Sequence, residues 1–242
     1  MQRRFFVASP LSSLKTCLLS ATVSHHLVSV LRAKSGQSIV LFDGTGVEYA
    51  AEIIEITKKQ VRVTVGQAVQ VERESPLKIT LFQGLSRQER MDYVIQKAVE
   101  LGVFRIVPII TERAQVRLTD DRRLRKMQHW QRIIESACEQ SGRTVLPVIE
   151  QPVLWQDVIH LETESLKLVC SPWHRGLHWS QLERPAAVHL MIGPEGGLSE
   201  EEVATAVANG YRPMSMGPRI LRTETAAVAA LSLLQGHWGD LA

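Results

Sequence analysis

Ile192-Gly193-Pro194-Glu195-Gly196-Gly197-Leu198-Ser199 and Met216-Gly217-Pro218-Arg219-Ile220-Leu221-Arg222-Thr223-Glu224-Thr225-Ala226-Ala227 are the most informative segments of this chain. Each follows an apolar stretch typical of a strand and precedes an apolar-periodic stretch typical of a helix. Open α/β sheets bind ligands at the carboxyl ends of their strands. The two segments, called here the first and second Gly-Pro loops, therefore predict a small-molecule site.

The first Gly-Pro loop can approach a ligand with its backbone, because its glycines lack a Cβ atom and tolerate positive φ. Ser199 and Glu202 match a capping box, which predicts a helix over 200–209. The loop matches neither G-x-G-x-x-G nor a P-loop. Three consecutive acidic residues follow it at 200–202 and would repel a triphosphate, so we do not expect ATP as the ligand.

The second Gly-Pro loop places Arg219 and Arg222 beside the start of a helix, where unpaired N–H groups are available. A simpler interpretation is that Arg222 forms a surface ion pair with Glu224 and that Thr223 only caps the helix. The presence of two similar loops, separated by one helix and one strand, favours the ligand site.

Composition is that of an ordinary globular chain, with 242 residues, 45% hydrophobic and 22% charged. No apolar run approaches the roughly 20 residues of a membrane span, and the apolar run at 5–8 is too short for a signal peptide, so we expect a cytoplasmic protein.

Three cysteines without a C-x-x-C pair indicate reduced thiols. Cys170, His174 and His178 could supply metal ligands, but a fourth partner is missing, so we expect no metal.

The charge is unevenly distributed, although the net charge is only +3. No acidic residue precedes Asp43, and a second basic cluster covers 113–132. Such clusters are often solvated helix faces, but beside a ligand site they suggest contacts with a phosphate backbone. The candidate RNA-binding residues are Arg3, Arg4, Arg32, Lys34, Arg113 and Arg143.

Two domains are expected. Residues 1–72 are β-rich, with strands over 5–7, 38–42, 49–56 and 61–65, and the charged, proline-containing stretch at 73–77 reads as a linker. From 78 to 242 strands and helices alternate, which predicts a mostly parallel sheet covered by helices. The expected strands are 79–82, 103–110, 144–149, 166–170, 187–192 and 212–216, and the expected helices are 87–101, with Ser86 and Glu89 as a capping box, 121–140, 200–209 and 223–235.

The two Gly-Pro loops closely resemble the second and third motifs of the SPOUT class of RNA methyltransferases, specifically the RsmE family, which methylates N3 of a uridine in 16S ribosomal RNA. Shorter stretches along nearly the whole chain resemble the same family. They are Arg3-Arg4-Phe5-Phe6, His26-x-x-x-Val30-Leu31-Arg32, Leu41-Phe42-Asp43-Gly44, Gln96-Lys97-x-x-Glu100-Leu101-Gly102-Val103, Glu112-Arg113 and Ala137-Cys138-Glu139-Gln140-Ser141-Gly142-Arg143.

The resemblance implies a PUA-like β-barrel RNA-binding domain at 1–72 and a SPOUT (α/β-knot) methyltransferase domain at 78–242 with a C-terminal trefoil knot. The alternating pattern alone does not predict a knot, because knotted chains are rare. The resemblance also implies S-adenosylmethionine as cofactor, bound in a bent form, a homodimer whose assembly completes the active site, and 16S rRNA in the 30S subunit as substrate.

On this resemblance we expect the cofactor at Cys170, Ser171, Met191, Ile192, Gly193, Gly196, Gly197, Met216, Ile220, Leu221 and Ala226. Ordinary core packing is an equal alternative for Cys170 and Ser171. Uridine N3 must lose its proton before it can attack, so the site needs a base or a charge that stabilises the anion. We expect Arg222 to stabilise the anion, with Glu195 or Glu224 orienting it or taking the proton, although either carboxylate could only cap a helix or pair with arginine.

Two alternatives stay open. A SPOUT enzyme that methylates a ribose typically carries an Asn-x-Gly-x-x-x-Arg signature, and the corresponding stretch at 84–90 lacks that asparagine. A non-enzymatic ribosome-assembly factor would also use basic patches and a barrel, but it would have no use for two intact Gly-Pro loops.

Overall fold

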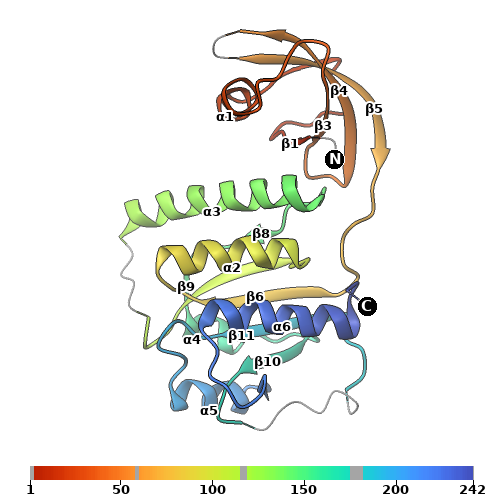
Figure 1. The fold of residues 1–242 in the computed structure, drawn as a ribbon. Coiled ribbons are helices and arrows are strands. Elements are labelled where there is room, and N and C mark those ends of the chain that lie inside the picture. Colours follow the sequence, from red (N-terminus) through yellow and green to blue (C-terminus); the bar gives the residue numbers. More distant parts are fainter. Residues whose placement is uncertain (1–2, 58–59, 115–118, 175–181, 242) are drawn as a thin grey trace. The chain divides into compact units, whose positions relative to one another are not determined.

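The computed structural model describes residues 3–57, 60–114, 119–174 and 182–241 (Figure 1). Contacts divide the chain into two compact units. The N-terminal unit is Met1–Glu74 with Glu135–Leu146, and the C-terminal unit is Ser75–Ile134 with Pro147–Ala242. Within the described residues, no helix is both long and apolar enough to cross a membrane.

The N-terminal unit contains a sheet of order β1-β3-β4-β5-β2, in which only β1 and β3 pair in parallel. The hairpin predicted over 49–65 is confirmed, and its strands are longer than expected. A short helix that continues into a π-helix was not predicted. The elements are β1 (Arg4–Phe6), β2 (Thr16–Leu18), α1 (Ala21–His25), η1 (His26–Val30), β3 (Ser38–Phe42), β4 (Val47–Ile56) and β5 (Val61–Gln70).

Side chains on one face of the strands build the core of this unit. Ile39 and Leu41 of β3, together with Val61 and Val63 of β5, are essentially fully buried, and Leu27 of η1 packs with them. Residues two apart in a strand share one face, so this pattern puts one side of the sheet against the helical turns. The unit therefore has its own hydrophobic core.

Partly buried ion pairs and hydrogen bonds of Arg4 and Arg143 connect the segment Glu135–Leu146 to the rest of the N-terminal unit. The Arg4 guanidinium lies 2.9 Å from Glu48 and donates to Arg143 O at 3.2 Å, and Arg143 itself pairs with Glu74. Burial lowers the pKa of Arg4, an effect that Glu48 partly offsets. Sequence predicts RNA contacts for Arg4 and Arg143, but their side chains are only 7% exposed and already paired. The structure therefore gives both arginines a structural role.

The C-terminal unit contains a parallel sheet of order β12-β10-β11-β6-β7-β8, and β9 also pairs with β7. The predicted parallel sheet is confirmed. Its strands are β6 (Lys78–Gly84), β7 (Arg105–Ile110), β8 (Val148–Ile149), β9 (Val153–Leu154), β10 (Leu166–Cys170), β11 (Ala187–Ile192) and β12 (Arg212–Met214).

Helices cover this sheet. On one face, α4 (Trp155–Ile159) and α5 (Glu200–Ala208) pack against Phe82 and Met191. Two further helices, α2 (Gln88–Glu100) and α6 (Thr223–Trp238), lie side by side, and α6 also contacts β11 (Figure 1). The remaining helix is α3 (Asp120–Ser141). After the edge strand β12, the chain therefore returns toward the middle of the sheet; the trefoil knot itself stays a prediction.

Two predicted helix starts have different outcomes. The capping box of α5 is confirmed, because Ser199 Oγ accepts from Glu202 N at 3.2 Å and Glu202 Oε2 accepts from Ser199 N at 2.9 Å. The capping box predicted for α2 is wrong. Ser86 is fully buried and donates to Gly84 O at 3.0 Å, and the helix begins after Arg87 without a side-chain cap.

The close approach at the end of β6 yields a stability prediction. A Cβ atom on Gly84 would lie 2.2 Å from Pro194 N, so we expect Gly84→Ala to lower the free energy of unfolding by about 1–3 kcal/mol. Gly236 in α6 is the control: a Cβ there meets nothing within 4 Å, and Gly236→Ala should stabilise by about 0.5–1 kcal/mol. Urea unfolding measures both, and an unchanged Gly84→Ala variant would contradict the tight packing.

Candidate active site

Three loops leave the sheet at one place. Cys170, the last residue of β10, pairs with Met214, the last residue of β12. Val169 of β10 pairs with Met191 near the end of β11. The carboxyl ends of these three adjacent parallel strands therefore lie together, and the segment after Cys170 meets both Gly-Pro loops. They enclose a pocket of about 740 Å³, within the range of small-molecule sites.

The pocket contains most of the predicted cofactor residues. Those that line it are Cys170, Ser171, Ile192, Gly193, Gly196, Gly197, Met216, Ile220, Leu221 and Ala226. Met191 is the exception. It is fully buried and its Sδ accepts from Trp155 Nε1 at 3.3 Å, so it belongs to the core under α4.

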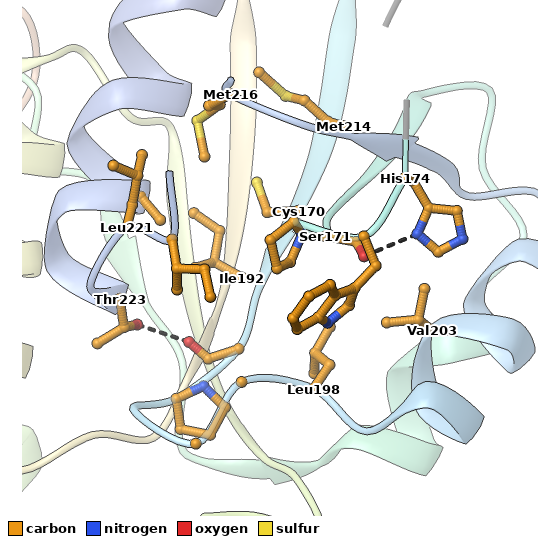
Figure 2. Close-up of a pocket in the computed structure, with 18 of the residues that line it drawn as sticks. Cys170, Ser171, His174, Ile192, Leu198, Val203, Met214, Met216, Leu221 and Thr223 are labelled. Carbon is orange, nitrogen blue, oxygen red and sulfur yellow. Dashed lines mark hydrogen bonds between the residues drawn. The ribbon is translucent and has the colours of Figure 1, made fainter. Parts of the chain in front are cut away.

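The interior of the pocket is largely apolar (Figure 2). Met216 and Leu221 extend into it from the second Gly-Pro loop, and Cys170 and Ile192 approach from the strand ends. Burial raises the pKa of the Cys170 thiol to about 12, so the thiol is neutral and contributes to the apolar wall. Such a surface suits an aromatic or thioether-bearing ligand.

Glycines leave room for that ligand. Gly197 and Gly217 have φ of +70° and +93°, a conformation that favours glycine, and a Cβ on either would meet nothing within 4 Å. Gly193 differs, because a Cβ there would lie 2.6 Å from Leu198 N. The first loop is therefore bent tightly at its start and open at its end. An adenosyl group with a sulfonium side chain fits the space and the chemistry of these walls.

Hydrogen bonds from neighbouring segments hold the first Gly-Pro loop. Glu202, whose second oxygen caps α5, accepts from Glu112 N at 2.9 Å through Oε1. Arg113, predicted to bind RNA, donates to Gly196 O at 3.2 Å and lines the pocket. The loop is thus held by the segment that follows β7 as well as by its own helix.

Of the three predicted catalytic residues, only Glu195 lines the pocket; Arg222 lies at the N-cap of α6 and Glu224 in its first turn. Glu195 lines the pocket and its Oε1 accepts from Arg87 N at 2.8 Å. Arg222 is exposed and precedes the first residue of α6, and within the described chain its side chain has no ion-pair partner. Glu224 pairs with Arg90 at 3.9 Å rather than with Arg222, so the surface ion pair considered from sequence is not formed. Nor is Thr223 the cap of the helix: it is the first helical residue.

Sequence reasoning missed Arg90. Its Nε lies 4.0 Å from Glu195 and 3.9 Å from Glu224, so one cation on α2 faces both carboxylates. The position of Arg90 within α2 does not predict these contacts, because its two partners lie more than a hundred residues away in the sequence. It also missed Trp173, which lines the pocket and is 75% exposed.

A metal site finds no support in the part of the chain that the structure describes, where no cluster of three potential ligands occurs. His174 forms a hydrogen bond of 2.9 Å with Ser171 Oγ (Figure 2). His178, which completed the spacing considered from sequence, lies outside the described residues.

Comparisons with known proteins agree with this geometry. Residues 73–235 match a family described as RNA methyltransferase domain, and residues 19–66 match one described as RNA methyltransferase PUA domain. Ribosomal RNA small subunit methyltransferase E of Buchnera aphidicola subsp. Schizaphis graminum is 36% identical, over 92% of this chain and 91% of the relative.

Two solved structures are also similar over 100% of both chains. One is a methyltransferase from Legionella pneumophila with bound S-adenosylmethionine, 42% identical with a TM-score of 0.95. The other is ribosomal RNA small subunit methyltransferase E from Neisseria gonorrhoeae bound to S-adenosylmethionine, 36% identical with a TM-score of 0.91.

A parallel α/β sheet with a two-loop pocket, joined to a PUA-type unit, defines an RNA methyltransferase, and this confirms the predicted SPOUT-type fold class. The chain belongs to the ribosomal RNA small subunit methyltransferase E family.

The anchoring of the first loop yields a second stability prediction. Glu202 is 8% exposed, and its carboxylate accepts hydrogen bonds from two backbone N–H groups. Glu202→Ala should therefore lower the free energy of unfolding by about 1–3 kcal/mol. Glu201→Ala removes an exposed carboxylate from the same turn and should change it by less than about 0.5 kcal/mol. Thermal and urea unfolding compare the two variants, and equal effects would show that the two bonds of Glu202 add nothing.

Proposed function

We propose that this chain transfers a methyl group from S-adenosylmethionine to N3 of one specific uridine in 16S rRNA, acting as a homodimer on the assembled 30S subunit in the cytoplasm. Membership of the family and the cofactor bound in two similar structures support this proposal. The observation that carries it is the convergence of both Gly-Pro loops on one pocket, with open space where Gly197 and Gly217 lack Cβ atoms.

The cofactor supplies a methyl group already activated by a sulfonium, so most of the protein's task is positioning. The apolar walls at Ile192, Met216 and Leu221 would hold the adenosyl group, and the backbone of the first loop would hydrogen-bond its polar atoms. Because Cys170 is neutral, it does not compete as a nucleophile for the methyl group.

Deprotonation of uridine N3 is the chemical step that the protein must assist. We assign the stabilisation of negative charge on the flanking carbonyl oxygens to Arg222, whose exposed guanidinium is not engaged by another described residue. Of the two carboxylates, we assign the proton acceptor to Glu224: its Oε2 faces Arg90 at 3.9 Å but accepts no hydrogen bond from a described residue, whereas Glu195 already accepts from Arg87 N. Glu195 then serves mainly to hold the first loop.

The reacting edge of uracil is its pairing edge, so the target base must be unpaired or flipped out. Phosphate contacts that hold the surrounding RNA are proposed for exposed cations. Arg32 and Lys34 are exposed in the N-terminal unit, and Arg113 is exposed at the rim of the pocket in the C-terminal unit. Arg3 is partly buried and donates to Leu31 O at 3.4 Å, which makes it the weaker candidate.

The proposed reaction is tested with unmodified 30S subunits and free 16S rRNA, labelled S-adenosylmethionine and nucleoside analysis for 3-methyluridine. We expect product from 30S subunits, and a loss of about 100-fold or more in Arg222→Ala with unchanged cofactor affinity. Arg212→Ala, an exposed arginine on β12, is the control. Full activity of Arg222→Ala would remove Arg222 from the mechanism, and full activity of Glu224→Gln would remove Glu224 as base.

Arg32 offers a test of RNA binding. It has φ of +48°, the one positive φ at a non-glycine residue in the described ranges, so Arg32→Gly should relieve about 1 kcal/mol of backbone strain while removing a charge. We expect Arg32→Gly to be at least as stable as wild type, yet to bind 16S rRNA more weakly. The slope of the logarithm of the binding constant against the logarithm of the salt concentration, called here the salt slope, should fall in magnitude by about 1. Arg32→Lys should keep the salt slope. Filter binding at several salt concentrations measures this, and an unchanged slope in Arg32→Gly would exclude a phosphate contact.

A non-enzymatic assembly factor would bind rRNA without binding the cofactor. Isothermal calorimetry with S-adenosylmethionine separates the two functions, because only the methyltransferase requires binding in the pocket. Absence of binding would overturn the proposed function.

A further inference from the structure

Gln83 is a buried amide in an otherwise apolar place. It is 0% exposed at the carboxyl end of the central strand β6, between Ile192 of β11 and Pro108 of β7. Burying an amide is costly unless its polar atoms are hydrogen-bonded. Its Oε1 has no partner in the part of the chain that the structure describes, so this residue is not explained by stability alone.

The amide group of Gln83 connects to the cofactor pocket through Thr223. Gln83 Nε2 donates to Thr223 Oγ1 at 2.8 Å. Thr223 Oγ1 in turn donates to Gly193 O at 2.6 Å, and Figure 2 shows this second bond as a dashed line. A carbonyl can only accept, so the single hydroxyl proton of Thr223 must point to Gly193. The hydroxyl can then only accept from Gln83, which fixes the direction of both bonds.

This chain of hydrogen bonds joins the end of the second Gly-Pro loop to the start of the first. Thr223 lines the pocket and is 5% exposed, whereas Gln83 does not line it. The backbone at Gly193 is already constrained on the other side, because Gly84 approaches it without room for a Cβ. A small rotation of the Gly193 carbonyl would therefore alter the bend of the whole first loop.

We propose that Gln83 and Thr223 are positioning residues for the cofactor site: their hydrogen bonds set the Gly193 carbonyl and so hold the first Gly-Pro loop open for its ligand. The inference rests on the proposed function in taking S-adenosylmethionine as that ligand. The positioning that Nε2 provides then explains why Gln83 is present, although its Oε1 is buried without a hydrogen bond.

Gln83→Met is the sharpest variant, because it preserves volume, removes an unsatisfied buried acceptor and, apart from a longer bond of 3.3 Å to Gly84 O, reaches the pocket through Thr223. We expect its stability to equal or exceed that of wild type, its affinity for S-adenosylmethionine to fall about fivefold, and the amides of 193–198 to exchange faster with solvent in the free protein. Stability and affinity would thus move in opposite directions, which a purely structural role does not produce.

Thr223 completes the test. Thr223→Val removes both bonds and should weaken cofactor affinity by about tenfold, whereas Thr223→Ser should restore it. Thr225→Val changes an exposed threonine of the same helix and should have no effect. Because the bonds act in series, the Gln83→Met, Thr223→Val double variant should lose no more affinity than Thr223→Val alone.

Hydrogen exchange keeps the inference separate from the proposed function. If wild type failed to bind S-adenosylmethionine, the proposed function would fall, while faster exchange at 193–198 in Gln83→Met would still support the positioning role. Unchanged exchange and unchanged affinity in a folded Gln83→Met, or additive losses in the double variant, would overturn it. If Thr223→Val did not fold, Gln83→Met and Thr223→Ser would decide on their own.

Discussion

Parallel strands that are neighbours in a sheet place their carboxyl ends on one edge, and the site is built on this constraint. β10, β11 and β12 are neighbours in the order β12-β10-β11, which differs from their order in the chain. Because β12 joins the sheet beside β10, the second Gly-Pro loop begins one strand away from the end of β11, where the first loop begins, with only the end of β10 between them. Had β12 joined at the opposite edge beside β8, the two loops would lie across the sheet from each other and could not share a pocket.

Local sequence was sufficient for most of the longer elements, but not for the short ones at β2, α1, η1, β9 and α4 or for the order of the strands in the sheet. The strands at 166–170 and 187–192 were predicted with the limits that the structure has, because each is an apolar run ended by turn residues. The side of the sheet that each residue faces was harder to predict from the sequence. Met191 and Ile192 are adjacent, yet Met191 packs against Trp155 and Ile192 lines the pocket. In a strand a one-residue difference reverses the face, and a continuous apolar run does not reveal which residue faces which side.

Charge patterns predicted less than hydrophobic patterns, because a sequence does not show where a cation finds its partner. Arg4 and Arg143 pair with Glu48 and Glu74, acidic residues tens of residues away. For Arg222 and Glu224, helix geometry argues against a pair, since residues two apart do not face each other. The actual partner of Glu224 is Arg90, on another helix. Long-range ion pairs of this kind require the fold.

The chemistry explains why the site separates neutral and charged groups. A sulfonium methyl group needs no further activation, so the pocket must mainly be rigid and correctly shaped. Thr223 and Gly193 provide that rigidity with a buried neutral hydrogen bond, which neither salt nor pH near neutrality weakens. The carboxylates Glu195, which lines the pocket, and Glu224, which does not, both face Arg90. In the proposed reaction these charged groups act on the uridine, where negative charge must develop.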